Sequence, residues 1–141
     1  MQFFPKKVLH RKWFTMRRNP KRSMVDVRGS KLAFGSFGLK ATSEARVRSN
    51  QLEAARKVIS RALGKTGKTW VRVFPDMPYT QKPAEVKMGK GKGDLQGYQV
   101  QVWPGRIMFE IDGITEAEAR EALRKAGTKL PLKTKVVSRE S

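Results

Sequence analysis

Cysteine is absent from the 141-residue sequence, which excludes disulfide-stabilised scaffolds and thiolate metal sites. Histidine occurs once, as His10, so the chain lacks the pairing of a base with a nucleophile that hydrolases use. No apolar run approaches the roughly 20 residues that a membrane-spanning helix needs. Asp76, Glu110 and Asp112 do not have the spacing of metal ligands. We therefore expect no enzyme activity, no metal, no cofactor, no small-molecule substrate and no membrane association.

Acidic residues are also scarce, since 12 Asp and Glu stand against 31 Lys and Arg and give a formal net charge of +19. So large an excess opposes a compact state by repulsion and predicts a polyanionic partner, of which nucleic acid is the commonest. The length favours one domain. The first 31 residues hold ten of the basic residues and one acid, Asp26. We expect a basic N-terminal arm over residues 1–31 and one folded domain over residues 32–141.

The arm has aromatic residues among its basic ones. Trp13 and Phe14 could stack on bases or pack against the domain, and the sequence leaves both open. The arm has no apolar stretch of the kind found in secretory signals, and only one serine precedes residue 24, which is poor in serine for a mitochondrial presequence. We expect the arm to remain attached and to bind the anionic partner.

Two amphipathic helices are predicted. In residues 50–63, Asn50 and Glu53 have the spacing of a capping box, and an apolar stripe is formed by Leu52, Ala55, Ile59, Ala62 and Leu63. Lys57, Arg61 and Lys65 form a basic ridge on the opposite face. The ridge is either a solvated surface or a face for the polyanion. Residues 116–126 follow a capping box of Thr115 and Glu118, and Ala119, Ala122, Leu123 and Ala126 are expected to face inward. The charges cancel in two i, i+4 pairs, Glu116 with Arg120 and Glu121 with Lys125. We expect this second helix to be structural.

Residues 69–74, 98–103, 106–111 and 133–137 have the composition or alternation of β-strands. The dipeptide Pro104-Gly105 predicts a tight turn, and the two strands that flank it are expected to pair with each other. Strands mixed with two helices, without a regular βαβ alternation, indicate the α+β class.

The segment 76–97 is predicted to be an extended loop. It contains prolines near its start and the run Gly-Lys-Gly-Lys-Gly over residues 89–93. A loop of this length in a compact domain either has a function or is a floppy hairpin tip.

The stretch 62–69 (ALGKTGKT) approaches a P-loop pattern, but its first glycine is replaced by alanine. A phosphate-binding P-loop follows a strand and opens a helix. Here a predicted helix ends and a predicted strand begins, so we expect the glycines to end the helix rather than to bind nucleotide.

Several motifs occur together and in order. They are FGSFGLKA (34–41), QLEAAR (51–56), GKTWVRVFPD (67–76), KP (82–83), MGKGKG (88–93), PG (104–105) and KLP (129–131). Together they resemble the bacterial large-subunit ribosomal protein sixteen family over about residues 3–137. The resemblance implies a hammerhead-like α+β RNA-binding domain that contributes to late assembly of the large subunit. Large-subunit (23S-type) rRNA, tRNA in the A and P sites and neighbouring ribosomal proteins are the implied partners.

The resemblance implies a location in the cytoplasmic ribosome, with an organellar ribosome as the alternative. It also implies which residues contact rRNA and which lie close to tRNA. Expected rRNA contacts are Lys6, Lys7, Arg11, Lys12, Arg17, Arg18, Phe34, Ser36, Lys40, Arg56, Lys57, Arg61, Lys65 and Lys68. The expected tRNA-proximal loop contains Lys82, Lys87, Met88, Lys90 and Lys92.

The sequence departs from the family pattern at two positions. Lys87 stands where many members have an arginine that some of them modify, so bidentate phosphate contact is lost there. Arg48 stands where the usual threonine precedes the first helix, so we expect capping to shift to Ser49 or Asn50. A general nucleic-acid architectural protein of the nucleoid is the alternative reading.

Replacement of Lys87, Lys90 and Lys92 together by alanine tests the function of the loop. Because the loop offers few apolar side chains, the thermal midpoint should stay nearly unchanged. If each lysine meets a phosphate, the salt slope of log affinity for RNA should fall by roughly 2 to 3 units, at about 0.7–0.9 per contact. The variant should still enter large subunits but should bind tRNA less well. A large fall in the midpoint, or normal tRNA binding with an unchanged salt slope, would contradict this role.

Overall fold

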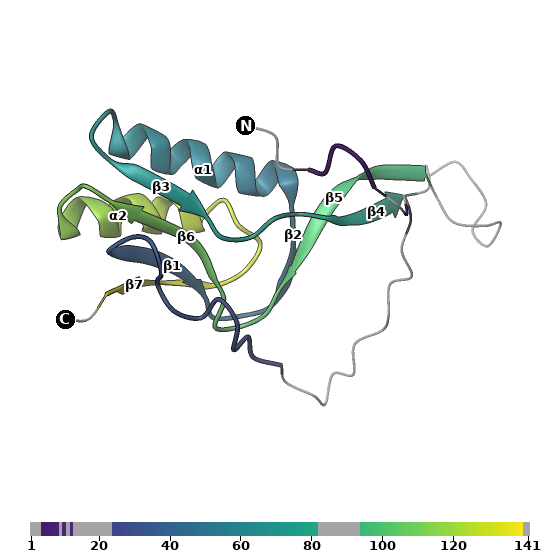
Figure 1. Ribbon diagram of the computed structural model, residues 1–141, viewed down its shortest axis with the longest axis horizontal. Helices are drawn as coiled ribbons and strands as arrows, with labels where there is room; N and C mark the ends of the chain where they lie inside the picture. Colours follow the sequence, from purple (N-terminus) through teal and green to yellow (C-terminus); the bar gives the residue numbers. More distant parts are fainter. Residues whose placement is uncertain (1–3, 9, 11, 13–23, 82–93, 140–141) are drawn as a thin grey trace.

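The computed structural model describes residues 4–8, 10, 12, 24–81 and 94–139, and the elements below belong to these residues (Figure 1). Their order along the chain is β1 (Phe37–Ala41), β2 (Ala45–Arg48), α1 (Ser49–Leu63), β3 (Lys68–Val71), β4 (Met77–Gln81), β5 (Asp94–Val102), β6 (Ile107–Asp112), α2 (Glu116–Gly127) and β7 (Thr134–Ser138). Two helices and antiparallel sheets confirm the α+β class.

A four-stranded antiparallel sheet with the order β3-β6-β1-β7 forms the body of the domain. Helices α1 and α2 pack against each other and cover one face of this sheet (Figure 1). Leu39 and Phe109 from the sheet join Leu52, Ile59 and Leu123 from the helices in one buried core. We call the face under the helices the inner face and the opposite one the outer face.

The helices lie close to their predicted positions. Helix α1 buries Leu52, Ala55, Ile59 and Leu63, whereas Ala62, which was expected in the apolar stripe, is exposed. Helix α2 begins with the predicted capping box, in which the Thr115 hydroxyl accepts a hydrogen bond from the N–H of Glu118. Its apolar face is buried as expected.

The expected capping of α1 is wrong. Arg48 occupies the N-cap position, and its backbone N–H donates to the side-chain oxygen of Gln51 at 2.9 Å. The side chain of Gln51 thus forms one of the two hydrogen bonds of a capping box, the bond to the backbone N–H of the N-cap residue. Neither Ser49 nor Asn50 is the N-cap residue. Glu53, expected to complete the box, instead pairs with Arg56.

The expected hairpin around Pro104 is also wrong. The chain does turn there, since the Arg106 N–H donates to the Trp103 carbonyl, and Gly105 has the φ of +101° that favours glycine. However, β5 pairs with β2 and β4 in a separate three-stranded sheet, whereas β6 lies in the four-stranded sheet. The Gly105 N–H donates to the Ala41 carbonyl, so the turn is a corner between two sheets.

The segment expected to be a loop between residues 75 and 98 contains two strands. β4 and the first part of β5 pair antiparallel down to Gln81 and Asp94. Pro78 is tolerated within β4 because this strand lies at the edge of its sheet and needs no ladder donor on its outer side. Residues 82–93 lie outside the described residues.

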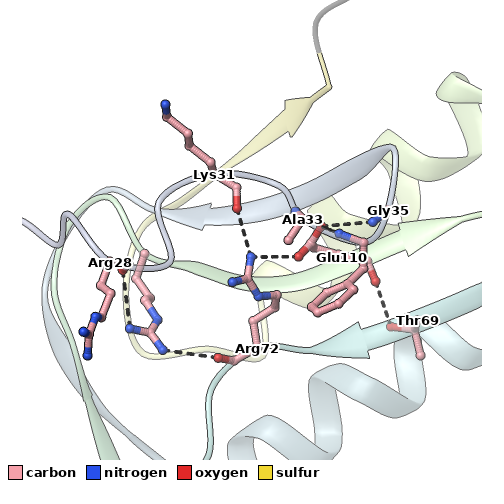
Figure 2. A network of polar contacts seen from close by, with 9 residues as sticks. Arg28, Lys31, Ala33, Gly35, Thr69, Arg72 and Glu110 are labelled. Atoms are coloured by element: carbon pink, nitrogen blue, oxygen red, sulfur yellow. Dashed lines mark hydrogen bonds and ion pairs between the residues drawn. The ribbon is translucent and has the colours of Figure 1, made fainter.

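Residues 29–35, which we call the strap, cross the outer face of the four-stranded sheet (Figure 2). The Gly29 carbonyl accepts from the N–H of Ile107. Leu32 lies directly over Gly38 of β1, where a Cβ atom would collide with the leucine side chain. A glycine is therefore required in the middle of a buried strand so that the strap can lie flat on the sheet.

Glu110 of β6 fixes the strap. Its side chain is completely buried, and one carboxylate oxygen accepts hydrogen bonds from the backbone N–H groups of Ala33, Phe34 and Gly35 at 2.9, 2.9 and 3.0 Å (Figure 2). The other oxygen forms an ion pair with the Arg72 guanidinium at 2.9 Å. The same guanidinium nitrogen donates to the carbonyl of Lys31. One carboxylate thus binds the strap to strand β6.

The pKa of Glu110 reports the balance at this site. Burial by itself would raise the pKa of the carboxyl, but the N–H groups of Gly35, Phe34 and Ala33 and the Arg72 guanidinium outweigh burial and hold the pKa below the ordinary 4.5. A carboxylate whose folded-state pKa is lowered contributes stability above the unfolded pKa. That stability is lost as the pH falls through the folded-state value.

The substitution Glu110→Gln should lower the free energy of unfolding by about 2–4 kcal/mol at pH 7, because an amide cannot accept from all four donors and its NH₂ group faces the guanidinium. Urea denaturation measures the change. The difference from wild type should be complete above about pH 5 and should shrink as the pH falls below 4.5. The control is Glu116→Gln in an exposed pair of α2, which should change stability by less than about 0.5 kcal/mol. Equal effects of the two substitutions would contradict the role of Glu110.

Candidate nucleic-acid interface

The basic ridge lies on the exposed face of α1 and continues into the turn after it. Lys57, Arg61 and Lys65 are all exposed, and among the described residues none of them forms an ion pair. The helix begins near the three-stranded sheet, and its last turn carries Arg61, next to the carbonyl end, where positive charge is favourable. The dipole of one helix end explains the placement of one or two cations, but not a ridge that starts at Lys57. The ridge therefore presents uncompensated positive charge to the surroundings.

Arg56 was expected to belong to the same RNA contact, but it is committed within the helix. Its guanidinium pairs with Glu53 at 2.6 Å and donates to the Ser60 hydroxyl at 3.4 Å. The hydrogen bond with Arg56 lowers the pKa of Glu53, although burial opposes it, and the same bond raises the pKa of Arg56. Because Arg56 is half-buried and its charge is paired with Glu53, it is less available to an anionic partner than the exposed cations of the ridge.

The turn after α1 carries Lys65 and Lys68, both exposed. The helix ends at Leu63, with Gly64 as its C-cap residue, and β3 begins at Lys68. The order is helix, turn, strand, as the sequence predicted, which is the reverse of the strand, turn, helix order of a P-loop. Lys65 and Lys68 extend the basic surface of α1 toward the edge strand β3.

Of three further predicted contacts, Phe34 lies in the strap, Ser36 lies between the strap and β1, and the half-buried Lys40 lies in β1. Phe34 is 57% exposed and stacks on Trp70 with ring centroids 6.0 Å apart, and the Arg72 guanidinium lies 5.5 Å from the Phe34 ring. An exposed ring held between an aromatic and a cation is well placed to meet a base. The Ser36 hydroxyl, by contrast, donates to Asp112 at 3.0 Å and serves the fold.

The arm and the long loop are described only in part. Lys6, Lys7 and Lys12 are exposed, and Phe4 stacks on Tyr98 of β5 at 6.2 Å with nearly parallel rings. The other predicted contacts of the arm and of the loop lie outside the described residues: Arg11, Arg17, Arg18, Lys82, Lys87, Met88, Lys90 and Lys92.

Two arginines of β2 were missed by sequence reasoning. Arg46 and Arg48 are exposed on one face of this strand, while Val47 between them is buried. The Arg46 guanidinium donates to the side-chain oxygen of Gln101 at 3.1 Å, and that of Arg48 lies 4.7 Å from the centre of the Tyr79 ring. The signal was the alternation Arg-Val-Arg, which is typical of a strand with one wet face.

The second helix differs from these surfaces because its charges cancel. Arg120 pairs with Glu116 at 3.0 Å and Arg124 pairs with Glu121 at 2.7 Å. The predicted partner of Glu121, Lys125, is more distant at 3.9 Å. The hydrogen bond with Arg124 lowers the pKa of Glu121 and raises the pKa of the arginine. The exposed face of α2 is thus close to neutral in a strongly basic chain.

The described residues contain no group of three His, Asp or Glu side chains placed to hold a metal ion. Neither helix within them is long and apolar enough to cross a bilayer. The features that stand out there are exposed cations and aromatic rings.

Comparison with known proteins bears directly on these basic surfaces. Residues 5–137 match the family described as ribosomal protein L16p/L10e. Proteins named large ribosomal subunit protein uL16 are similar over most of their length. The one from Polaromonas naphthalenivorans is 56% identical over 115 residues, which cover 82% of this chain and 83% of the relative. The one from Cereibacter sphaeroides is 56% identical over 112 residues, which cover 79% and 82%.

The match spans the strap, both helices, strands β1–β6 and all of β7 except its last residue, so the motifs noted in the sequence and the α1 ridge lie within it. With a family model that spans nearly the whole chain and relatives above half identity, the chain belongs to the ribosomal protein L16p/L10e family.

Proposed function

We propose that the protein is a structural component of the large subunit of the cytoplasmic ribosome and that it binds large-subunit rRNA through the α1 ridge. The observation that carries this proposal is the contrast between the two helices. Lys57 and Arg61 on α1 and Lys65 in the turn after it are exposed without ion pairs among the described residues, whereas the cations of α2 are paired with acids. The names of the similar proteins from Polaromonas and Cereibacter support the assignment to the large subunit.

The physical reason is counterion release. Each Lys or Arg that neutralises a phosphate frees a condensed cation from the RNA, which favours binding and makes it depend on salt. Unpaired surface cations contribute most to the free energy of phosphate binding, because no existing ion pair with an acid has to be broken. Cations that already neutralise glutamates, as on α2, gain less. The RNA-facing side of the domain is therefore the side of α1.

A structural role accords with the chemistry of the exposed groups. Lys and Arg side chains bind phosphate, and the described part of the chain contains no group of three His, Asp or Glu side chains that could hold a metal ion. The nucleoid alternative predicts sedimentation with DNA. Family membership favours sedimentation with the large subunit instead. A role in late assembly of that subunit belongs to the same proposal.

Contact with tRNA near the peptidyl-transferase centre is the finer part of the proposal. Strands β4 and β5 pair down to Gln81 and Asp94 and extend away from the two helices (Figure 1). Residues 82–93, which hold the predicted tRNA-proximal lysines, connect these two strand ends. The paired strands β4 and β5 thus carry both ends of segment 82–93 at a distance from helix α1.

Replacement of Lys57, Arg61 and Lys65 together by alanine tests the role of the ridge. If each cation meets one phosphate, the slope of log affinity against log salt should fall by roughly 2 to 3 units for a large-subunit rRNA transcript. Because all three side chains are exposed, each substitution should change stability by no more than about 0.5 kcal/mol. Filter binding over a potassium chloride series measures the slope, and circular dichroism measures the thermal midpoint.

The control carries the same loss of charge on the other helix, through Arg120→Ala, Arg124→Ala and Lys125→Ala. Its salt slope should fall by less than about 1 unit, because these cations are paired with acids. Equal slopes in the two variants would mean that net charge rather than the ridge drives binding. Failure of the wild-type chain to sediment with large subunits would contradict the proposed function as a whole.

A further inference from the structure

The outer face of the four-stranded sheet carries a second basic surface, which surrounds a hollow of about 410 Å³. Lys31 of the strap, Lys40 of β1 and Arg139 at the end of β7 line this hollow, together with the hydroxyl-bearing Ser138. Leu32 and Ile107 line its apolar part. We call it the outer pocket. Apart from Lys40, none of its cations was singled out by the sequence.

Three distant segments build the outer pocket through hydrogen bonds that the fold already requires. The carbonyl of Lys31 accepts from Arg72, which Glu110 holds in place (Figure 2). Strand β1 pairs with β7 in a regular antiparallel register that sets Lys40 opposite Lys135. The N–H of Arg139 donates to the carbonyl of Ser36 at 2.8 Å. The backbones that carry the three cations are thus fixed without any ligand.

The charge of the outer pocket is unbalanced. Its described lining includes two lysines and one arginine and no acid, and none of these cations forms an ion pair within the described residues. Lys135, exposed and opposite Lys40 in the register, adds a fourth positive charge nearby. Next to a nearly dry apolar wall such as Ile107, an anion interacts with these cations more strongly than it would in open water.

The outer pocket and the α1 ridge lie on opposite sides of the sheet. Leu39 belongs to the core under the helices and approaches Gly127 of α2, so its strand neighbour Lys40 is directed to the other face. Helix α1 lies on the inner side (Figure 1). A single stretch of RNA backbone laid along the ridge therefore does not reach the outer pocket without passing around the edge of the sheet.

We propose that the outer pocket binds backbone phosphates of a second rRNA segment, distinct from the segment that meets the α1 ridge. This inference rests on the proposed function and adds a second face to it. A guanidinium and two ammonium groups around a hollow with hydroxyl groups suit a phosphate, which accepts several charge-assisted hydrogen bonds at once. The chain joins two RNA segments through opposite faces of one sheet.

The absence of cysteine allows a direct test in assembled subunits. An iron chelate attached to Ala33→Cys would release hydroxyl radicals beside the outer pocket, since Ala33 is exposed and follows Leu32 of the lining. The matched control is Ala117→Cys, another exposed alanine, on the neutral helix α2. We expect strong rRNA cleavage from position 33, at sites different from those cleaved from a third tether, Lys57→Cys, on the ridge. Cleavage from position 33 no stronger than from position 117 would overturn the inference.

Substitution of the cations tests the contact itself. The variant Lys31→Ala, Lys40→Ala, Arg139→Ala should lower the salt slope for the rRNA transcript by roughly 2 to 3 units, at about 0.7–0.9 per phosphate. The charge-matched α2 variant described above should lower the slope by less. Lys31→Ala with Arg139→Ala, both at exposed positions, serves as a second variant if the triple one lowers the thermal midpoint, with a slope reduced by about 1 to 2 units.

These outcomes separate the inference from the function on which it rests. If the wild-type chain enters large subunits but position 33 cleaves no rRNA and the slope matches that of the α2 control, the outer pocket faces an acidic protein surface or solvent, and the inference is wrong. If the wild-type chain does not enter large subunits, the proposed function fails, and the inference fails with it.

Discussion

A single buried carboxylate organises one side of a protein whose surface is overwhelmingly basic. Glu110 accepts three backbone hydrogen bonds from the strap and pairs with Arg72, which in turn holds the carbonyl of Lys31. Neutral backbone donors supply most of these contacts, so the carboxylate satisfies groups that would otherwise be left unpaired over the sheet. This one side chain therefore fixes both the position of Phe34 against Trp70 and the position of Lys31 beside the outer pocket.

The few other acids have a comparable effect on the surface. Glu53 removes Arg56 from the pool of available cations, and Glu116 and Glu121 neutralise the exposed face of α2. In a chain with a net charge of +19, the acids therefore determine which faces carry little excess positive charge. Exposed cations without such an acid among the described residues include those of the α1 ridge and those around the outer pocket. Repulsion among them weakens the isolated fold, and phosphate bound at each surface would relieve it.

Local pattern was sufficient for both helices and for most of β5, β6 and β7, because each shows the period of its own secondary structure. It was insufficient for partners. The alternation around Pro104 predicted two strands correctly, but pairing depends on residues far along the chain, and β5 and β6 turned out to lie in different sheets. Strand β1 was not predicted, because Gly38 weakens the strand pattern. The reason for that glycine, the strap residue Leu32 lying on it, is visible only in three dimensions.

The same distinction applies to the binding surfaces. The α1 ridge could be predicted because its members recur along one helix, whereas the outer pocket unites residues 31, 40 and 139, which are joined only by the order of strands. That order has a functional consequence. Strand β1 lies between β6 and β7 in the sheet, with Leu39 directed to the helices and Lys40 to the outer face. The same strand therefore contributes both to the core and to the outer pocket. Helix α1, packed on that core, carries the ridge. RNA segments bound on the two faces would be held at a separation set by one sheet and one helical layer, which the dense core makes rigid.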